Sequence, residues 1–327
     1  MRIPQSLGLA LSASAAVAVL AACSGAGQQS LSLPMQSQSQ QSVSRQSMNT
    51  ADLLAGASTT VAGGLYVAQM TENFVREYTL PNKGNMAPRC TDTFAQTDVN
   101  GIGVNAKRVL YVPDGGARKI LTFGTNCGAA GPTLIASHGR PTDVAFDNTA
   151  NNTVYVADSS TNCIDVYDKG ATLPTRTLCN AAIKGSLGDA VDAQGNVYQS
   201  GVSSANIARY LKGQQTGSTI LGLTGLKNPV GLEFDTKGNL IVIDSSNGIL
   251  IYAPPYKGAP TKRISTRGLS YYGKLDAANL NLYVGDFTFG SADVYSYPSG
   301  TFEYSITNGL NLNNGITGIA VDPPSAN

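Results

Sequence analysis

Four aspartates stand at matching places in the sequence, where they could together hold a metal ion. Each ends a short apolar run: Asp114, Asp158, Asp244 and Asp286. Carboxylates are suitable ligands for hard cations such as Ca²⁺. A short polar residue at the end of such a run can instead accept hydrogen bonds from the backbone of the following turn. Because the position recurs so regularly, we interpret these aspartates as turn caps rather than as a metal ring.

The chain contains one histidine, His138, in the segment Ser137-His-Gly-Arg-Pro141, with Asp143 close by. A zinc site built on several histidines is therefore excluded. A single histidine can still act as a general base, but the sequence assigns it no nucleophile. We interpret His138 as a surface or loop-bonding side chain, and we keep it and Asp143 as candidate binding residues.

Two charged residues occupy positions where the rest of the chain has small ones. The equivalent positions, two residues before a recurring Asp or Asn, are Gly103, Ala145, Ala190, Glu233, Lys274 and Ala320. A charge in a crowded interior is costly unless it is paired. We therefore predict that Glu233 and Lys274 form an ion pair. The pair is either interior filler without a ligand or the polar part of a small-molecule pocket.

Aromatic residues gather in the same part of the sequence as Lys274. Tyr271 and Tyr272 precede it, and Phe287 and Phe289 follow the next apolar run. Exposed aromatic clusters are typical contact sites, whereas a buried cluster would only plug the interior. We expect these four side chains to lie together. The chain has no Trp, which argues against sugar stacking or a quinone cofactor.

All of these positions belong to an internal repeat. One aromatic or branched residue marks it at steps of 42 to 45 residues: Tyr66, Tyr111, Tyr155, Tyr198, Ile241 and Tyr283. A second aromatic follows 11 to 14 residues later, from Tyr78 in the first unit to Tyr297 in the last. A third set of equivalent positions is occupied by Asp or Asn: Asn105, Asp147, Asp192, Asp235, Asp276 and Asp322. Because several sets of matching residues recur with the same spacing, the sequence indicates six copies of one structural unit.

Each unit has the pattern of four short strands, which we name A to D. In the unit around Tyr155 they are expected at Thr142–Phe146, Thr153–Ala157, Ile164–Tyr167 and Arg176–Leu178, from alternating apolar residues and polar turns. Four-stranded units of this length are typical of β-propeller blades. The first unit, from Leu65, lacks strand A, and 318–322 resemble a strand A with nothing after it. We predict an all-β propeller with six antiparallel blades, closed by the C-terminal strand in the N-terminal blade.

Two segments, NTVYVADSSTNCIDVYD and NPVGLEFDTKGNLIVIDSSNGILIY, resemble NHL-type repeats. The resemblance extends over all six units and implies the six-bladed fold that includes gluconolactonase- and regucalcin-like enzymes. The chain is also similar to propeller lipoproteins of bacteria. In the resembling enzymes the active site lies on the face that carries the B–C and D–A loops, so we expect a site there. The fold itself does not define an activity.

The N-terminus is typical of an exported lipoprotein. Basic Arg2 precedes an apolar stretch that is too short and too rich in Ser to span a membrane. Leu20-Ala-Ala-Cys23 resembles the bacterial lipobox, which implies cleavage before Cys23 and lipidation of its thiol; an ordinary secretory signal is the alternative. Ser24 favours the outer membrane, facing the periplasm or the cell surface. The expected domains are a signal peptide at 1–22, the lipidated Cys23 with a Ser/Gln-rich tether at 23–61, and the propeller at 62–327.

The other four cysteines predict two disulfides, because exported proteins meet an oxidising environment. Cys163 and Cys179 flank one hairpin and should face each other. Cys90 and Cys127 fall in neighbouring units and form the second pair of our preferred pairing. Lys and Arg number 22 against 21 Asp and Glu. The charges are balanced and no basic segment stands out, so the sequence does not predict binding to nucleic acid.

Together these features predict a monomeric, non-catalytic binding module of the cell envelope. It would bind a protein or a small molecule near the fifth and sixth blades, and the lipid would be its only link to the membrane. The alternative is a metal-assisted, lactonase-like hydrolase or lyase at the mouth of the axial channel, with Glu233 and Asp143 as ligands. Lys274 beside Glu233 would repel a metal ion. We therefore expect neither a metal nor a cofactor.

Overall fold

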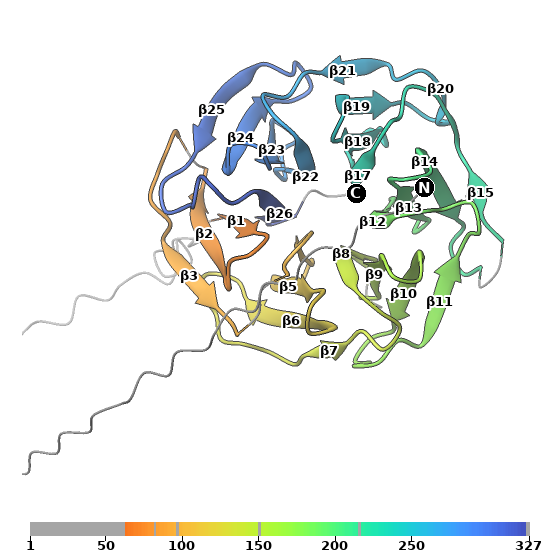
Figure 1. Ribbon diagram of the computed structural model, residues 1–327, viewed down its shortest axis with the longest axis horizontal. Coiled ribbons are helices and arrows are strands. Elements are labelled where there is room, and N and C mark those ends of the chain that lie inside the picture. The colour runs from red at the N-terminus through yellow and green to blue at the C-terminus, as the bar shows by residue number, and fades with distance from the viewer. Residues whose placement is uncertain (1–62, 82, 96–97, 150–151, 215–216, 325–327) are drawn as a thin grey trace, which may run out of the picture. The chain divides into compact units, whose positions relative to one another are not determined.

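The computed structural model describes residues 63–81, 83–95, 98–149, 152–214 and 217–324. They form a ring of six four-stranded antiparallel sheets, with the first strand of each blade nearest the centre (Figure 1). The predicted six-bladed propeller is thereby confirmed. Among the described residues, no helix is long and apolar enough to span a membrane. The expected signal peptide, Cys23 and the tether lie outside the described residues.

The blades follow one another along the chain, except that the last strand belongs to the first blade. Blade 1 contains β26 (Ile316–Asp322), β1 (Gly63–Gln69), β2 (Phe74–Leu80) and β3 (Cys90–Thr93); blade 2 contains β4 (Gly103–Val104), β5 (Val109–Asp114), β6 (Lys119–Gly124) and β7 (Leu134–Ile135); blade 3 contains β8 (Pro141–Phe146), β9 (Val154–Asp158), β10 (Cys163–Tyr167) and β11 (Arg176–Cys179).

The second half of the ring repeats this arrangement. Blade 4 contains β12 (Ser186–Val191), β13 (Val197–Gly201), β14 (Asn206–Tyr210) and β15 (Thr219–Ile220); blade 5 contains β17 (Pro229–Phe234), β18 (Leu240–Asp244), β19 (Gly248–Tyr252) and β21 (Lys262–Ile264); blade 6 contains β22 (Ser270–Leu275), β23 (Asn281–Asp286), β24 (Ser291–Ser296) and β25 (Phe302–Ile306). A short parallel pair joins β16 (Gly222–Leu223), which lies between blades 4 and 5 in the sequence, to β20 (Lys257–Gly258), which lies between β19 and β21 of blade 5.

The turns between strands A and B are built by the recurring aspartates. Asp235 accepts hydrogen bonds from the backbone amides of Lys237 and Asn239, at 3.0 and 2.7 Å. Gly238 completes this turn with a φ of +74°, a conformation that costs glycine little. The turn places β17 and β18 side by side, and all of β18 is buried because blades cover both of its faces.

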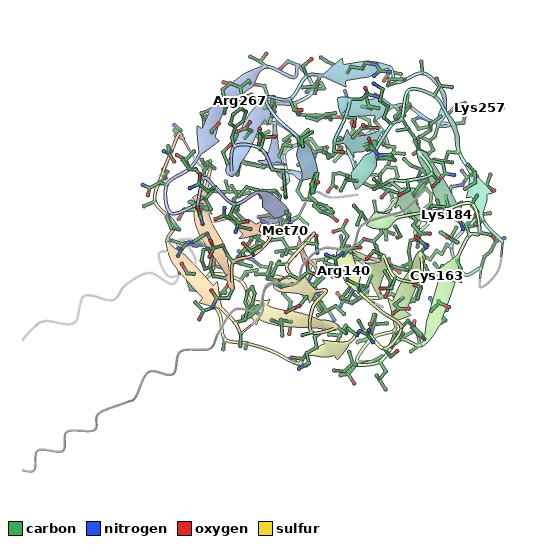
Figure 2. The ribbon with its side chains drawn as sticks, in the orientation of Figure 1. Met70, Arg140, Cys163, Lys184, Lys257 and Arg267 are labelled. Atoms are coloured by element: carbon green, nitrogen blue, oxygen red, sulfur yellow. A yellow bond between two sulfur atoms is a disulfide. The ribbon has the colours of Figure 1, made fainter. Side chains whose placement is uncertain are left out.

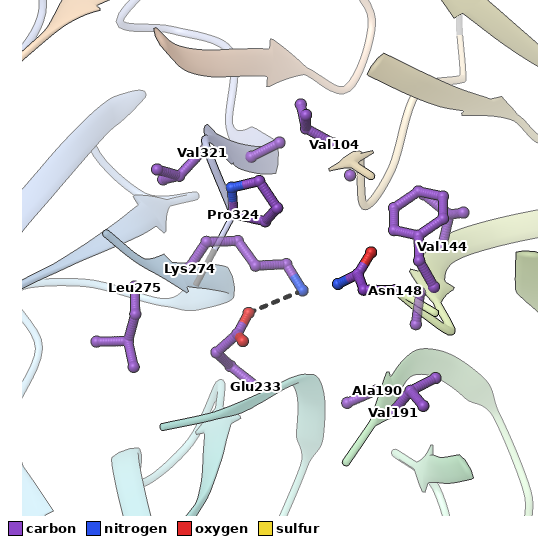
Figure 3. Close-up of a pocket in the computed structure, with 14 residues that line it drawn as sticks. Val104, Val144, Asn148, Ala190, Val191, Glu233, Lys274, Leu275, Val321 and Pro324 are labelled. Carbon is purple, nitrogen blue, oxygen red and sulfur yellow. Dashed lines mark ion pairs between the residues drawn. The ribbon is translucent and has the colours of Figure 1, made fainter. Parts of the chain in front are cut away.

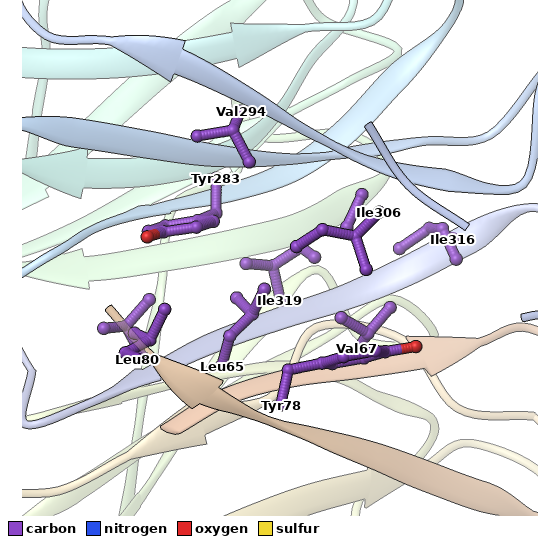
Figure 4. Packing of buried hydrophobic residues seen from close by; sticks show 11 residues of the cluster. Leu65, Val67, Tyr78, Leu80, Tyr283, Val294, Ile306, Ile316 and Ile319 are labelled. Atoms are coloured by element: carbon purple, nitrogen blue, oxygen red, sulfur yellow. The ribbon is translucent and has the colours of Figure 1, made fainter. Parts of the chain in front are cut away.

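The ring closes where β26 pairs antiparallel with β1, with Val321 opposite Leu65 and Ile319 opposite Val67. This is the predicted closure. Side chains of β26 and β1 pack against blade 6, including Tyr283 (Figure 4). Burying one large aliphatic side chain such as Ile319 contributes roughly 1.5–3 kcal/mol. The C-terminal strand therefore supplies both the missing backbone ladder and part of the contact between the first and last blades.

Both predicted disulfides are present. Cys163 and Cys179 are directly opposite each other on β10 and β11, with their Cα atoms 4.4 Å apart. Cys90 of β3 is bonded to Cys127 in the loop after β6, with Cα atoms 6.0 Å apart. The second bond links blade 1 to blade 2. The pairing agrees with the prediction from the sequence, because Cys90 on β3 and Cys127 in the loop after β6 belong to neighbouring blades.

Candidate functional site

An ion pair lies at the centre of the ring. Lys274 of β22 places its Nζ 3.1 Å from Oε2 of Glu233 on β17, as predicted. Their side chains are 17% and 7% exposed, so water reaches the pair only in part. The equivalent positions of the other four blades are small: Gly103, Ala145, Ala190 and Ala320. These small residues leave room for the two long charged side chains.

A pocket with a cavity volume of about 50 Å³ lies over this ion pair (Figure 3). Val104, Phe146, Val191, Leu275 and Val321 form its apolar wall, together with the four small residues. Asn148, in the turn after β8, and Pro324, just after β26, also line it. All of these residues lie at the A–B end of the innermost strands. The pocket therefore lies at the end of the ring opposite to the B–C/D–A face, on which we expected a site by resemblance.

Tyr272 closes the other half of the axis. Tyr272 is 2% exposed, and its single hydroxyl proton is shared between the carbonyl oxygens of Leu187 and Thr142, at 2.9 and 3.1 Å. Both carbonyls and Tyr272 itself lie where β-bulges interrupt the pairing of strands A and B. A bulge turns backbone groups out of the ladder, and here they turn towards the axis. Tyr272 therefore has the buried position that the sequence left open as an alternative to an exposed cluster, because its side chain spans the interior.

Two buried aspartates lie beside the ion pair. Asp143 accepts a hydrogen bond from the backbone amide of Asp189 at 3.2 Å. Burial raises the pKa of Asp143 to about 7, against the effect of Lys274. Burial also raises the pKa of Asp189 well above its usual value, and Asp143 adds to that effect. Within the described residues, Oδ1 of Asp143 and both carboxyl oxygens of Asp189 have no hydrogen-bond partner.

Asp189 was not among the residues that the sequence pointed to. Its counterparts are apolar residues or glycine: Ile102, Val144, Leu232, Gly273 and Ile319. This departure from the repeat was a usable signal, of the same kind that identified Glu233. The structure brings Asp143, Asp189, Glu233 and Lys274 into one electrostatic cluster, since Lys274 lowers the pKa of both aspartates.

The remaining predicted aromatics lie on the B–C/D–A face of blade 6, without Tyr272. The rings of Tyr271 and Phe287 stack at a centroid distance of 4.7 Å and an interplanar angle of 20°. Phe289 is 46% exposed and lies beside Arg267, whose guanidinium carbon is 5.2 Å from the ring centroid. Figure 2 shows Arg267 over blade 6, away from the centre of the ring. We call Tyr271, Phe287, Phe289 and Arg267 the aromatic patch.

Hydrogen bonds between two loops hold the aromatic patch in place. The amide of Phe287 donates to the carbonyl oxygen of Leu269 at 2.7 Å. Asp286 accepts from the amides of Thr288 and Phe289, at 2.8 and 3.0 Å. Asp158 and Asp244 cap the corresponding turns of blades 3 and 5 in the same way. The turn-cap interpretation of these aspartates is confirmed.

His138 lies apart from both features and contacts a buried carboxylate. Its Nδ1 is 2.8 Å from Oδ1 of Asp165 on β10, and its side chain is 45% exposed. Burial raises the pKa of Asp165, and His138 opposes that effect. The neighbouring Arg140 makes two hydrogen bonds of 2.8 Å to Asp98. The contacts of His138 and Arg140 agree with a loop-bonding role.

One group of potential metal ligands occurs among the described residues: Glu77, Cys90 and Cys127. The two sulfurs are joined in a disulfide, so neither is a thiolate ligand. Glu77 is also occupied, since it accepts hydrogen bonds from Tyr66 and the amide of Cys127, at 2.7 and 2.8 Å. These contacts make the group a structural junction between blades 1 and 2.

No protein-family model and no curated protein matches the sequence. Solved structures do match the fold. A chain in a crystal structure of a nidogen/laminin complex aligns with a TM-score of 0.67 and 20% identity over 81% of this chain and all of that chain. A protein of unknown function from Bacteroides caccae aligns with a TM-score of 0.61 and 10% identity, covering 80% of this chain and 98% of that one. At these identities the likeness shows the propeller fold alone.

Proposed function

We propose that the chain is a lipid-anchored, extracytoplasmic propeller of the cell envelope that binds a partner protein without catalysing a reaction. The observation that carries this proposal is the aromatic patch on blade 6. Three aromatic rings and an arginine, residue types that are enriched in protein interfaces, lie on neighbouring segments of blade 6, and the Asp286 turn cap holds the loop that carries Phe287 and Phe289. A preorganised patch loses little conformational entropy when a partner binds.

Two further observations support a protein partner. Leu269 and Phe302 next to the patch are 46% and 40% exposed, which extends its apolar area. Arg267 lies 5.1 Å from the ring centroid of Phe302 as well, so one guanidinium joins two exposed rings. A structurally similar chain comes from a complex of two proteins, nidogen and laminin. The likeness suggests that such a ring can serve as a binding surface.

The metal-assisted alternative has less support from the geometry. It requires Glu233 and Asp143 to share an ion, yet no group of three potential ligands among the described residues includes either of them. Glu233 is instead paired with the ammonium of Lys274, and Asp143 is fully buried. The proposed arrangement is therefore a binding surface on one face of the ring and a closed axis beneath it.

The proposal is tested by capture of partners from envelope extracts. Tyr271→Ala combined with Phe289→Ala removes one half-buried and one exposed ring of the patch, and Leu280→Ala is the matched control. Leu280 is 62% exposed in the A–B turn of the same blade, at its opposite end. We expect one protein to bind the unaltered chain and the control but not the double variant. The same proteins captured by all three chains would contradict the proposal.

The lipid anchor is tested separately. Cys23→Ser removes the thiol that would carry the lipid, so the variant should not incorporate a labelled fatty acid in a bacterial host. We expect the unaltered chain in the membrane fraction and the variant in the soluble periplasmic fraction. A variant that remains in the membrane fraction would contradict lipid anchoring through Cys23.

A further inference from the structure

The axial pocket differs in chemistry and position from the aromatic patch. One side consists of Gly103, Ala145, Ala190 and Ala320, and the other carries Glu233 and Lys274. Apolar side chains surround the path from the ion pair to the surface. An amphipathic pocket of this kind, with few polar groups on an apolar wall, is typical of small-ligand sites.

Two N–H donors face the same space within the pocket. Asn148 uses its Oδ1 to accept a hydrogen bond from the backbone amide of Ala106 at 3.2 Å, which assigns the amide orientation. Its Nδ2 is turned across the pocket towards Nζ of Lys274 (Figure 3). Among the described residues, Lys274 donates to Glu233 and, at 3.5 Å, to the carbonyl oxygen of Leu232. An ammonium has three donors, so one remains for a ligand.

We propose that this pocket binds small carboxylates that have an apolar body. A carboxylate oxygen accepts hydrogen bonds from Lys274 and Asn148 together, and the aliphatic or aromatic body lies against Val104, Val191 and Leu275. An amine would instead place its own donors against two donors. The cavity of about 50 Å³ is several times the space one water needs, which suits a carboxyl group whose chain continues past Pro324.

The buried aspartates behind the ion pair do not oppose an anionic ligand strongly. Burial raises the pKa of Asp143 to about 7 and that of Asp189 well above its usual value, and both shifts favour the neutral carboxyl. Lys274 stays charged, since neighbouring carboxylates outweigh the effect of burial and raise its pKa. The ligand therefore meets one ammonium and one paired carboxylate.

Binding is tested by calorimetry on the full-length chain with three probes of equal length: hexanoate, 1-hexanol and hexylammonium. We expect hexanoate to bind about tenfold more tightly than the other two, as a hydrogen bond to a charged group would provide. Equal binding of the three probes, tightest binding of hexylammonium, or no binding of hexanoate would each overturn the proposal.

Variants then locate the site. Asn148→Ala should weaken hexanoate binding about tenfold, and Asn148→Asp should weaken it further by repulsion. Exposed Asn313→Ala, on a loop of blade 6, is the control and should change nothing. The double variant Glu233→Leu with Lys274→Met removes both charges together, so neither is left unpaired, and it should abolish the preference for hexanoate over 1-hexanol. Unchanged hexanoate affinity in Asn148→Ala and in the double variant would overturn the proposal.

Discussion

Replacing Asp143 by Asn is expected to stabilise the ring above pH 7 and to leave its stability at pH 4 nearly unchanged. The usual pKa of an Asp is 3.8, and burial raises that of Asp143 to about 7. A carboxyl with a raised pKa in the folded state favours folding below its unfolded pKa. This contribution is lost as the pH rises from about 4 to 7. Three pH units correspond to ~4 kcal/mol, an upper bound because neighbouring groups titrate with Asp143.

The charges of Glu233 and Lys274 act on Asp143, and Asp143 in turn raises the pKa of Asp189 and of Tyr272. The assay is urea unfolding of the unaltered chain and of Asp143→Asn between pH 4 and 8. The difference in unfolding free energy should increase with pH to several kcal/mol. Asp168→Asn is the control, because its partner Arg176 lowers the pKa of that exposed carboxyl. Parallel curves for Asp143→Asn and the unaltered chain, or lower stability of the variant at pH 8, would refute the reasoning.

Three other perturbations address the ring itself, and each is measured by denaturant unfolding. Ile319→Ala should cost about 3 kcal/mol, since the side chain is fully buried between blades 1 and 6; the half-exposed Ile135→Ala is its control and should cost less than about 1 kcal/mol. Loss of the bond between Cys163 and Cys179 through serine substitution of both should cost ~3 kcal/mol in the chain-entropy view, and an unchanged midpoint would contradict it. Tyr272→Phe removes the donor of the Leu187 carbonyl, whereas the carbonyl of Thr142 keeps the amide of Gly101 at 2.7 Å, so it should cost about 1–3 kcal/mol; an unchanged midpoint would contradict this.

The features that repeat could be predicted from the sequence. Matching registers gave the number of blades, and the missing strand A of the first unit required 316–322 to complete it, as β26 does. The position of Cys163 opposite Cys179 followed from one hairpin. The aspartate caps followed because short polar side chains at strand ends bond their own turns. Each of these predictions depends only on residues close in sequence or equivalent by repeat.

The positions along the axis could not be predicted in the same way. Strand A contains bulges, such as that between Ser270 and Gly273, and a bulge changes the direction of the residues near it. Tyr272 lies in this bulge and points inward, whereas Tyr271 reaches the surface to stack on Phe287. Sequence alternation alone assigns no bulge. The departures from the repeat were visible in the sequence, but the sequence left open which of these side chains fill the axis and which face the surface.

The two candidate sites lie at opposite ends of the innermost strands, and β1 begins at one of these ends. Gly64 at the start of β1 pairs with Asp322 near the end of β26, next to Pro324 in the pocket wall. Gly63, the first residue of β1, therefore lies at the end of the ring that carries the pocket, whereas the aromatic patch lies at the other end. Since the blocked axis separates them, binding at the two sites should be independent. Asn148→Ala should keep the partner protein, and the double variant of Tyr271 and Phe289 should keep hexanoate; loss of both activities in either variant would show that the sites are coupled.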